Sequence, residues 1–170
     1  MRIVAAFGVM LFLSFPAVAV TAPDADLSAP PPPPAEMPMA EPGVVDLFHS
    51  FGLFGTFAPN CSLPATPSNP HVSVTQQDGG LVIEAHNVGA EYATNLYGVR
   101  SARRLSKDRL EIKVVFVPGT QSEEFQTLEL LVVKGARRTM FNRVDNGAVR
   151  VKRGIAVAIG RKTPMLQKCE

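Results

Sequence analysis

The sequence lacks the short motifs that usually carry catalysis, metal binding or phosphate binding. It contains no H-x-x-x-H, H-E-x-x-H, G-x-S-x-G or G-x-x-x-x-G-K, and its three histidines, His49, His71 and His86, are scattered. We therefore predict no catalytic residues, no metal site and no cofactor. Enzymatic activity stays open as an alternative, because folding can bring catalytic residues together without a short motif.

Basic residues are missing from a long stretch of the chain. No Lys or Arg occurs between Pro23 and Tyr97, and every basic residue except Arg2 lies from Arg100 onward. The net charge of +2 therefore conceals an acidic first half and a strongly basic second half.

Residues 1–22 have the pattern of a secretory signal peptide. A positive charge at Arg2 precedes an uncharged apolar run over residues 3–15, and small residues then offer cleavage after Ala19 or Ala22. The run is short for a transmembrane helix and no later stretch is long enough, so we predict no membrane span after cleavage. A retained N-terminal anchor is the alternative. We expect an exported protein of the periplasm or the extracellular space.

A proline-rich segment separates this region from the folded part. Residues 23–43 consist mainly of proline, alanine and acidic residues, which favour extended polyproline II structure and a semi-rigid linker. A docking site for a proline-binding domain is the alternative. Residues 44–170 are richer in apolar residues and long enough for one compact core, so we predict a single domain there.

The folded part alternates between apolar and polar residues, which is typical of half-buried strands. The stretch RLEIKVVFV places Leu110, Ile112 and Val114 on one face and Glu111 and Lys113 on the other. Asp-Gly and Asn-Gly pairs between such runs favour hairpins, because both turn residues tolerate positive φ. The pattern therefore predicts short antiparallel strands joined by tight turns.

The predicted strands cover residues 71–77, 81–86, 92–104, 109–117, 125–134, 137–144, 148–153 and 155–160. A meander of this size closes into a barrel to remove its exposed edges. We predict an all-β fold, an up-and-down antiparallel meander of about eight strands closed as a lipocalin-like barrel, with a short helical segment on its N-terminal side.

The chain has only two cysteines, Cys61 and Cys169, and they flank the predicted strands. In a closed meander with an even number of strands, these two points fall at the same end of neighbouring strands. Two cysteines in an exported chain pair by default, so we predict a disulfide where the barrel closes. Free or intermolecular thiols are the alternative. The absence of C-x-x-C argues against redox chemistry.

Four phenylalanines lie three residues apart, Phe48, Phe51, Phe54 and Phe57. On a short helix or 3₁₀ stretch this spacing gathers them on roughly one side. There they would plug the barrel mouth, contact an apolar ligand or touch a membrane, and a position in the core is the alternative. We take them as candidate ligand-binding residues.

Basic residues of the second half fall on neighbouring predicted strands, where outward positions would merge into a positive face. The candidate anion-binding residues are Arg100, Arg103, Arg104, Arg137, Arg138, Arg150 and Lys152. Such a face would attract an anionic envelope component, whether lipid, lipopolysaccharide or an acidic protein. A solvated outer surface is the alternative. The export pattern and the lack of interleaved aromatic residues argue against nucleic acid.

Both ends of the folded part resemble a group of small exported bacterial proteins of unknown function. The segments FGTFAPNCSLPATPSNPHV, residues 54–72, and GRKTPMLQKC, residues 160–169, carry the resemblance. That group has G-T-W-A-x-x-C-S-x-P near the start of the domain and T-P-x-L-x-x-C at its end, and this chain departs at Phe57, where the group has Trp. The resemblance implies that Cys61 and Cys169 pair, and it implies no reaction.

The triplet Gly55, Thr56 and Phe57 is also similar to the G-x-W that opens the first strand of lipocalins, whose barrels hold apolar ligands. We therefore formulate two functional hypotheses, a barrel that binds a small apolar ligand and an envelope protein that uses its basic face. Bulky inward residues such as Leu110 and Phe116 argue for a filled interior and against the first.

Overall fold

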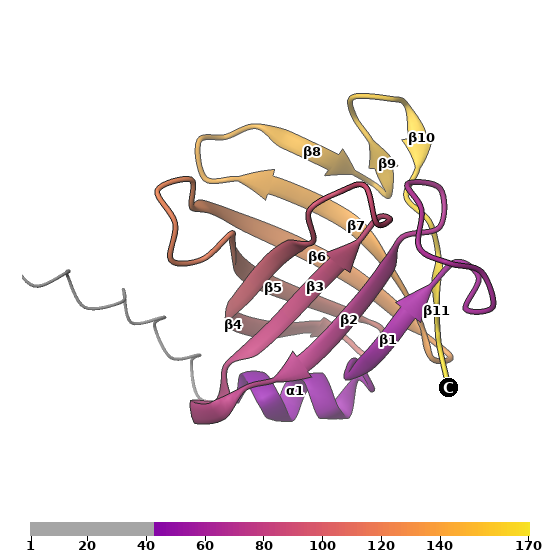
Figure 1. Ribbon diagram of the computed structural model, residues 1–170. Helices are drawn as coiled ribbons and strands as arrows, with labels where there is room; N and C mark the ends of the chain where they lie inside the picture. Colours follow the sequence, from indigo (N-terminus) through magenta and orange to yellow (C-terminus); the bar gives the residue numbers. More distant parts are fainter. Residues whose placement is uncertain (1–42) are drawn as a thin grey trace, which may run out of the picture. The chain divides into compact units, whose positions relative to one another are not determined.

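The computed structural model describes residues 43–170, and the predicted signal peptide and nearly all of the predicted linker lie outside them (Figure 1). The described part consists of one short helix, one 3₁₀ turn and a set of antiparallel strands. These elements are α1 (Val44–Ser50), β1 (Gly55–Ala58), β2 (His71–Gln76), η1 (Asp78–Gly80), β3 (Val82–Asn87), β4 (Asn95–Ser106), β5 (Arg109–Phe116), β6 (Glu124–Val133), β7 (Ala136–Val144), β8 (Val149–Lys152), β9 (Ile155–Ala156), β10 (Arg161–Lys162) and β11 (Leu166–Lys168).

Eight of these strands form a closed barrel. Strands β1 to β7 follow one another around it, each antiparallel to the next, and β11 lies between β7 and β1 and completes the ring. Every strand of the ring therefore has a neighbour on both sides, which removes the exposed edges of an open sheet. The predicted closed antiparallel all-β barrel is confirmed.

The strands that open and close the ring are not the predicted ones. β1 and β11 have four and three residues, which is too short for alternation to be visible in the sequence. The predicted strand 148–153 lies outside the ring as β8, and of the predicted strand 155–160 only Ile155 and Ala156 form a strand, β9, which pairs with β8 and with β10 outside the ring. On one edge of β7, residues Ala136 and Arg137 pair with β11, whereas Asn142 and Arg143 pair with β8.

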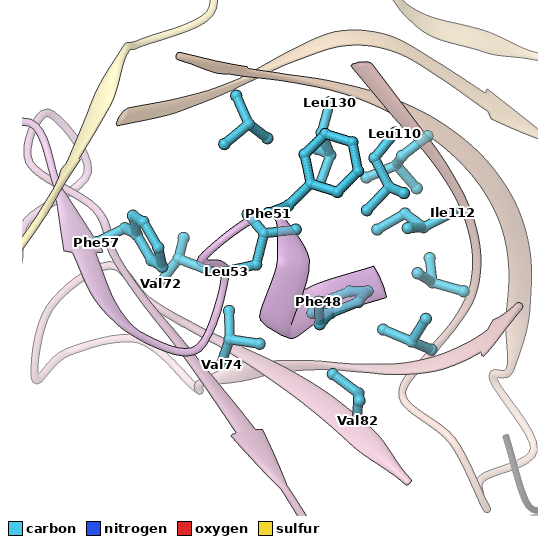
Figure 2. Packing of buried hydrophobic residues seen from close by; sticks show 14 of the residues in the cluster. Phe48, Phe51, Leu53, Phe57, Val72, Val74, Val82, Leu110, Ile112 and Leu130 are labelled. Carbon is cyan, nitrogen blue, oxygen red and sulfur yellow. The ribbon is translucent and has the colours of Figure 1, made fainter. Parts of the chain in front are cut away.

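Helix α1 lies across one end of the barrel and fills that end with its apolar face (Figure 1). Val44 and Phe48, four residues apart, share the buried side of the helix. Figure 2 shows Phe48 and Phe51 inside the ring of strands, with Leu53 beside them. The expectation that four phenylalanines share one helical segment is wrong, because α1 ends at Ser50 and Phe57 lies on β1.

The apolar core forms where this helical segment meets the inward positions of the strands. Phe48 is 0% exposed, and residues such as Val74, Ile112 and Leu130 surround the helical segment in Figure 2. These strand residues come from alternate positions, as the period of a half-buried strand requires. This end of the barrel interior is therefore packed with side chains.

Truncation of the central phenylalanine tests how much of the fold depends on this packing. We expect Phe48→Ala to lower the free energy of unfolding by about 3–5 kcal/mol, because it leaves a cavity in the core. Phe125→Ala, which alters a ring that is 45% exposed, serves as the matched control and should cost less than about 1 kcal/mol. Urea unfolding curves measure both, and equal losses would contradict this account of the core.

A disulfide joins the two strands that meet where the barrel closes. Cys61 follows β1 and Cys169 follows β11, and their Cα atoms lie 5.5 Å apart across the bond. The backbone N–H of Cys169 also donates to the carbonyl of Thr56 at 2.8 Å. Because β11 pairs with only two residues of each neighbour, few backbone hydrogen bonds hold it in place. The predicted disulfide is confirmed, and it ties the shortest strand of the barrel to β1.

Removal of this bond should have a large effect on stability. The two cysteines are 108 residues apart in sequence, and the chain-entropy model gives about 4.7 kcal/mol for a loop of about 100 residues. We expect the double variant Cys61→Ser and Cys169→Ser to lose about 2–5 kcal/mol of unfolding free energy in urea titrations. Reduction of the unaltered protein should give the same loss, and a change below about 0.5 kcal/mol in both would exclude this role.

Candidate functional site

The barrel interior changes from apolar to polar along β3, which runs away from α1 (Figure 1). Val82 belongs to the apolar core, whereas Glu84 and His86, the next residues on the same face, bring a carboxylate and an imidazole into the interior. Glu84 is buried and His86 is half-buried. The sequence contains a signal for this polar end of the interior, because Glu84 and His86 follow Val82 at every second position of the strand. Sequence reasoning did not identify these two residues as inward.

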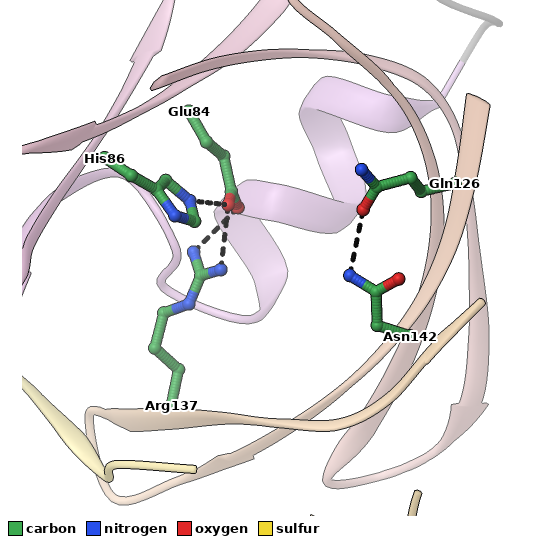
Figure 3. A network of polar contacts seen from close by, with 5 residues as sticks. All are labelled: Glu84, His86, Gln126, Arg137 and Asn142. Atoms are coloured by element: carbon green, nitrogen blue, oxygen red, sulfur yellow. Dashed lines mark hydrogen bonds and ion pairs between the residues drawn. The ribbon is translucent and has the colours of Figure 1, made fainter. Parts of the chain in front are cut away.

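Glu84 forms a bidentate ion pair with Arg137 of β7. The Nη1 and Nη2 atoms of Arg137 donate to Oε1 and Oε2 of Glu84 at 2.7 and 2.9 Å (Figure 3). Nε2 of His86 lies 3.3 Å from Oε2 of the same carboxylate. Burial opposes ionisation, but the charge of Arg137 and the hydrogen bonds outweigh it, and the pKa of Glu84 is lowered to about 2. Glu84 is therefore ionised over the whole neutral range.

The position of Arg137 corrects the sequence analysis, which places this residue on an outer basic face. The structure buries its side chain inside the barrel. Arg137 pairs in register with Val132, an inward residue of β6, so it shares the inner face of the barrel. Further along β7, Thr139 pairs with Leu130 and Phe141 pairs with Glu129, so Met140 is an extra residue at a β-bulge. The inward parity changes at this point, and strict alternation along β7 therefore gives the wrong face for part of the strand.

A second polar chain lies across the interior from the ion pair (Figure 3). Arg150 and Gln126 donate to the two carboxylate oxygens of Glu124 at 2.7 and 2.6 Å. Nδ2 of Asn142 donates to Oε1 of Gln126 at 2.9 Å, whereas Oδ1 of Asn142 is buried and accepts no hydrogen bond from the described residues. An acceptor in this state is able to receive a donor from a bound molecule.

A cavity of about 240 Å³ adjoins both polar groups. Its polar wall includes His86, Tyr97, Arg137, Thr139 and Asn142, and its apolar wall includes Val72, Leu128, Val151 and Leu166. The ring of Tyr97 packs against His86 and Phe116, with ring centres 4.6 and 5.0 Å apart, and burial raises the pKa of its hydroxyl. The hydroxyl therefore stays protonated at neutral pH and can donate a hydrogen bond.

The segment β8 to β10 forms one wall of this cavity and is fastened to β7. The N–H of Gly154 donates to the carbonyl of the bulged Met140 at 2.8 Å, and Arg138 donates to the carbonyl of Gly154 at 2.9 Å and to Oγ1 of Thr163 at 3.2 Å. Gly154 has φ +72°, and a Cβ atom there would lie 2.9 Å from Nη2 of Arg138. Arg138, a predicted anion-binding residue, thus holds the cavity wall in place.

The predicted ligand-binding phenylalanines lie elsewhere. Phe48, Phe51 and Phe57 belong to the buried core, and Phe54 is half-buried, with its ring centre 4.6 Å from that of His49. The lining of the 240 Å³ cavity includes none of the four. They belong to the apolar core or pack against it, and ligand contact by them stays a prediction.

The other predicted anion-binding residues are exposed or half-buried, and each makes separate contacts. Arg103 pairs with Glu111 at 2.8 Å, and the guanidinium of Arg104 lies 4.2 Å from the ring centre of Phe51 and donates to Ser50. The guanidinium of Arg100 lies 5.9 Å from the ring centre of Phe125. Arg150 pairs with Glu124, and Lys152 lines an outer cavity beside Arg109. Anion binding by these residues stays a prediction.

In the described part of the chain, no group of three or more His, Cys, Asp or Glu side chains is arranged to hold a metal ion. Over residues 43–170, no helix has the length and apolar character needed to cross a bilayer.

No family model, curated protein or solved structure matches this chain. The two resemblances noted in the sequence therefore stay predictions.

The buried ion pair predicts a specific dependence of stability on pH. Since the pKa of Glu84 falls from 4.5 to about 2 on folding, its stabilising effect is complete above about pH 4.5 and is lost as the pH falls towards 2, a change of about 3 kcal/mol. We expect Glu84→Gln to remove this acid-dependent part and to cost about 3–5 kcal/mol at pH 7, because Arg137 is left buried without its partner.

Urea unfolding between pH 2 and pH 7 measures both effects. Glu111→Gln, which breaks the exposed pair with Arg103, is the control and should cost less than about 1 kcal/mol. An acid-dependent loss in Glu84→Gln as large as in the unaltered protein would show that other carboxylates are responsible.

Proposed function

We propose that the protein is an exported binding protein that holds a small, mainly apolar molecule in the polar half of its barrel. The observation that carries this proposal is the cavity of about 240 Å³ in which an apolar wall faces the unpaired Oδ1 of Asn142. A buried acceptor without a partner costs about 1–3 kcal/mol, and a ligand that donates a hydrogen bond to it recovers this energy.

The cavity indicates the size and charge of the ligand. Its volume lies below the roughly 300–1,000 Å³ of sites for drug-sized molecules, so the ligand is smaller than these. The charges of Glu84 and Arg137 neutralise one another, so this pair leaves no net charge for a ligand to neutralise. A neutral molecule with an apolar body against Leu128 and Val72 and one N–H or O–H group towards Asn142 fits best.

Export is supported by the disulfide and by the sequence pattern of residues 1–22. Structural disulfides persist in oxidising compartments, such as the periplasm and the extracellular space, and are rare in the cytosol. A barrel that is tied at its closing strand by Cys61 and Cys169 suits such a compartment.

Native mass spectrometry of the full chain from its own source tests the binding proposal. We expect a small organic adduct that is released on denaturation. Val151→Trp, which fills the cavity, should abolish the adduct, whereas Val157→Trp, at a loop position that is 55% exposed, should keep it. Asn142→Ala should weaken rebinding of the released compound about tenfold, through loss of the acceptor.

Two results would overturn the proposal. One is an unaltered protein that carries no adduct and whose melting temperature does not change with a panel of small alcohols and amides. The other is an adduct that Val151→Trp and Val157→Trp retain equally.

A further inference from the structure

A row of four outward side chains crosses the wall of the barrel from β4 to β7. Ser101 pairs in register with Lys113, Lys113 with Thr127, and Thr127 with Arg143. These residues alternate along their strands with inward residues such as Val114 and Gln126, so they share the outer face. The row thus presents a hydroxyl, an ammonium, a hydroxyl and a guanidinium on four consecutive strands.

This row lies in a groove of about 410 Å³. Arg100, an extra residue at a bulge on β4, lines the groove together with Phe125 and Asp145. The ring of Phe125 is 45% exposed, so the groove combines an open aromatic surface with the polar row.

Positive charge dominates the groove. Three cations, Arg100, Lys113 and Arg143, line it against the single carboxylate of Asp145. Within residues 43–170, neither Lys113 nor Arg143 forms an ion pair. Lys113 and Arg143 lie on β5 and β7, on either side of Thr127 of β6, so an anion bound above Thr127 is attracted by both charges.

We propose that this groove binds the phosphate group of an amphiphilic molecule, with the apolar part of that molecule against Phe125. Adjacent strands lie about 4.8 Å apart, so Lys113 and Arg143 flank Thr127 at one strand spacing on either side. A phosphate above Thr127 receives hydrogen bonds from the ammonium, the hydroxyl and the guanidinium at once. A carboxylate has only two oxygens, so it accepts hydrogen bonds from these three donors less well than a phosphate does.

The groove is a separate site from the interior cavity. It lies on the outer face of the β5–β6 wall, whereas His86 and Arg137 of the cavity lie inside the barrel. Binding in the groove therefore does not depend on the interior ligand, and a cavity-filling variant such as Val151→Trp should leave it unchanged.

Isothermal titration of the full chain with three probes tests the proposal. Phenyl phosphate should bind with a dissociation constant of about 1 mM or lower at low salt and inorganic phosphate about tenfold more weakly, whereas benzyl alcohol should not bind measurably once Val151→Trp fills the interior cavity. Added salt should weaken both phosphate probes, because the groove is open to solvent. No binding of phenyl phosphate, or binding of benzyl alcohol to Val151→Trp with the affinity of phenyl phosphate, would overturn the proposal.

Matched variants locate the binding. Lys113→Gln and Arg143→Gln should each weaken phenyl phosphate about tenfold, since each removes a charged donor. Lys107→Gln and Arg161→Gln, which remove one exposed positive charge elsewhere, should leave the affinity unchanged. If all four variants weaken binding equally, the effect is general attraction to a basic protein, and the groove is not a site.

Vesicles distinguish the two sources of such a phosphate. Pelleting of the protein with phosphatidylglycerol vesicles but not with phosphatidylcholine vesicles, lost in Lys113→Gln and Arg143→Gln, would identify an anionic lipid head group. If the protein binds phenyl phosphate but does not pellet with either kind of vesicle, the ligand is a soluble phosphate compound. Vesicle binding that all four variants retain would place membrane contact outside the groove and contradict the lipid assignment.

Discussion

The ion pair between Glu84 and Arg137 determines how the barrel interior is divided. It crosses from β3 to β7, and Arg137 is at the same time the residue whose backbone pairs with Leu166 of the closing strand β11. The guanidinium also lies 5.6 Å from the ring centre of Phe57 on β1. One side chain thus connects the polar network, the closing strands and the edge of the apolar core.

A buried ion pair needs a reason beyond stability. Replacing such a pair with packed apolar residues is often neutral or stabilising, so the fold alone does not require Glu84 and Arg137. At the other end of the same barrel the interior is apolar, and Phe48 and Leu53 are fully buried there. The polar end instead keeps a cavity beside His86 and Asn142, which is what a binding site requires and a packed core does not.

Sequence reasoning succeeded where one physical rule acts alone. Alternation and turn residues predicted the antiparallel barrel and its middle strands, and the pairing of the two cysteines was predicted from barrel closure and from the expectation of export. It failed where elements are too short or irregular for a period, as in β1, β11 and the bulge at Met140. Arg137 was assigned to the wrong face because charge alone suggested exposure, although Glu84 on the inward face of β3 offered it a buried partner.

The single extra residue on β7 connects the two proposed sites. Before Met140 the inward residues are Arg137 and Thr139, and after it the inward residue is Asn142, while Arg143 lies on the outer face. With strict alternation from Arg137, Arg143 would point into the barrel and Asn142 would point out of it. The bulge therefore gives the cavity its unpaired acceptor and the outer groove its guanidinium. The carbonyl of Met140 also receives the N–H of Gly154, so the same irregularity fastens the cavity wall to β7.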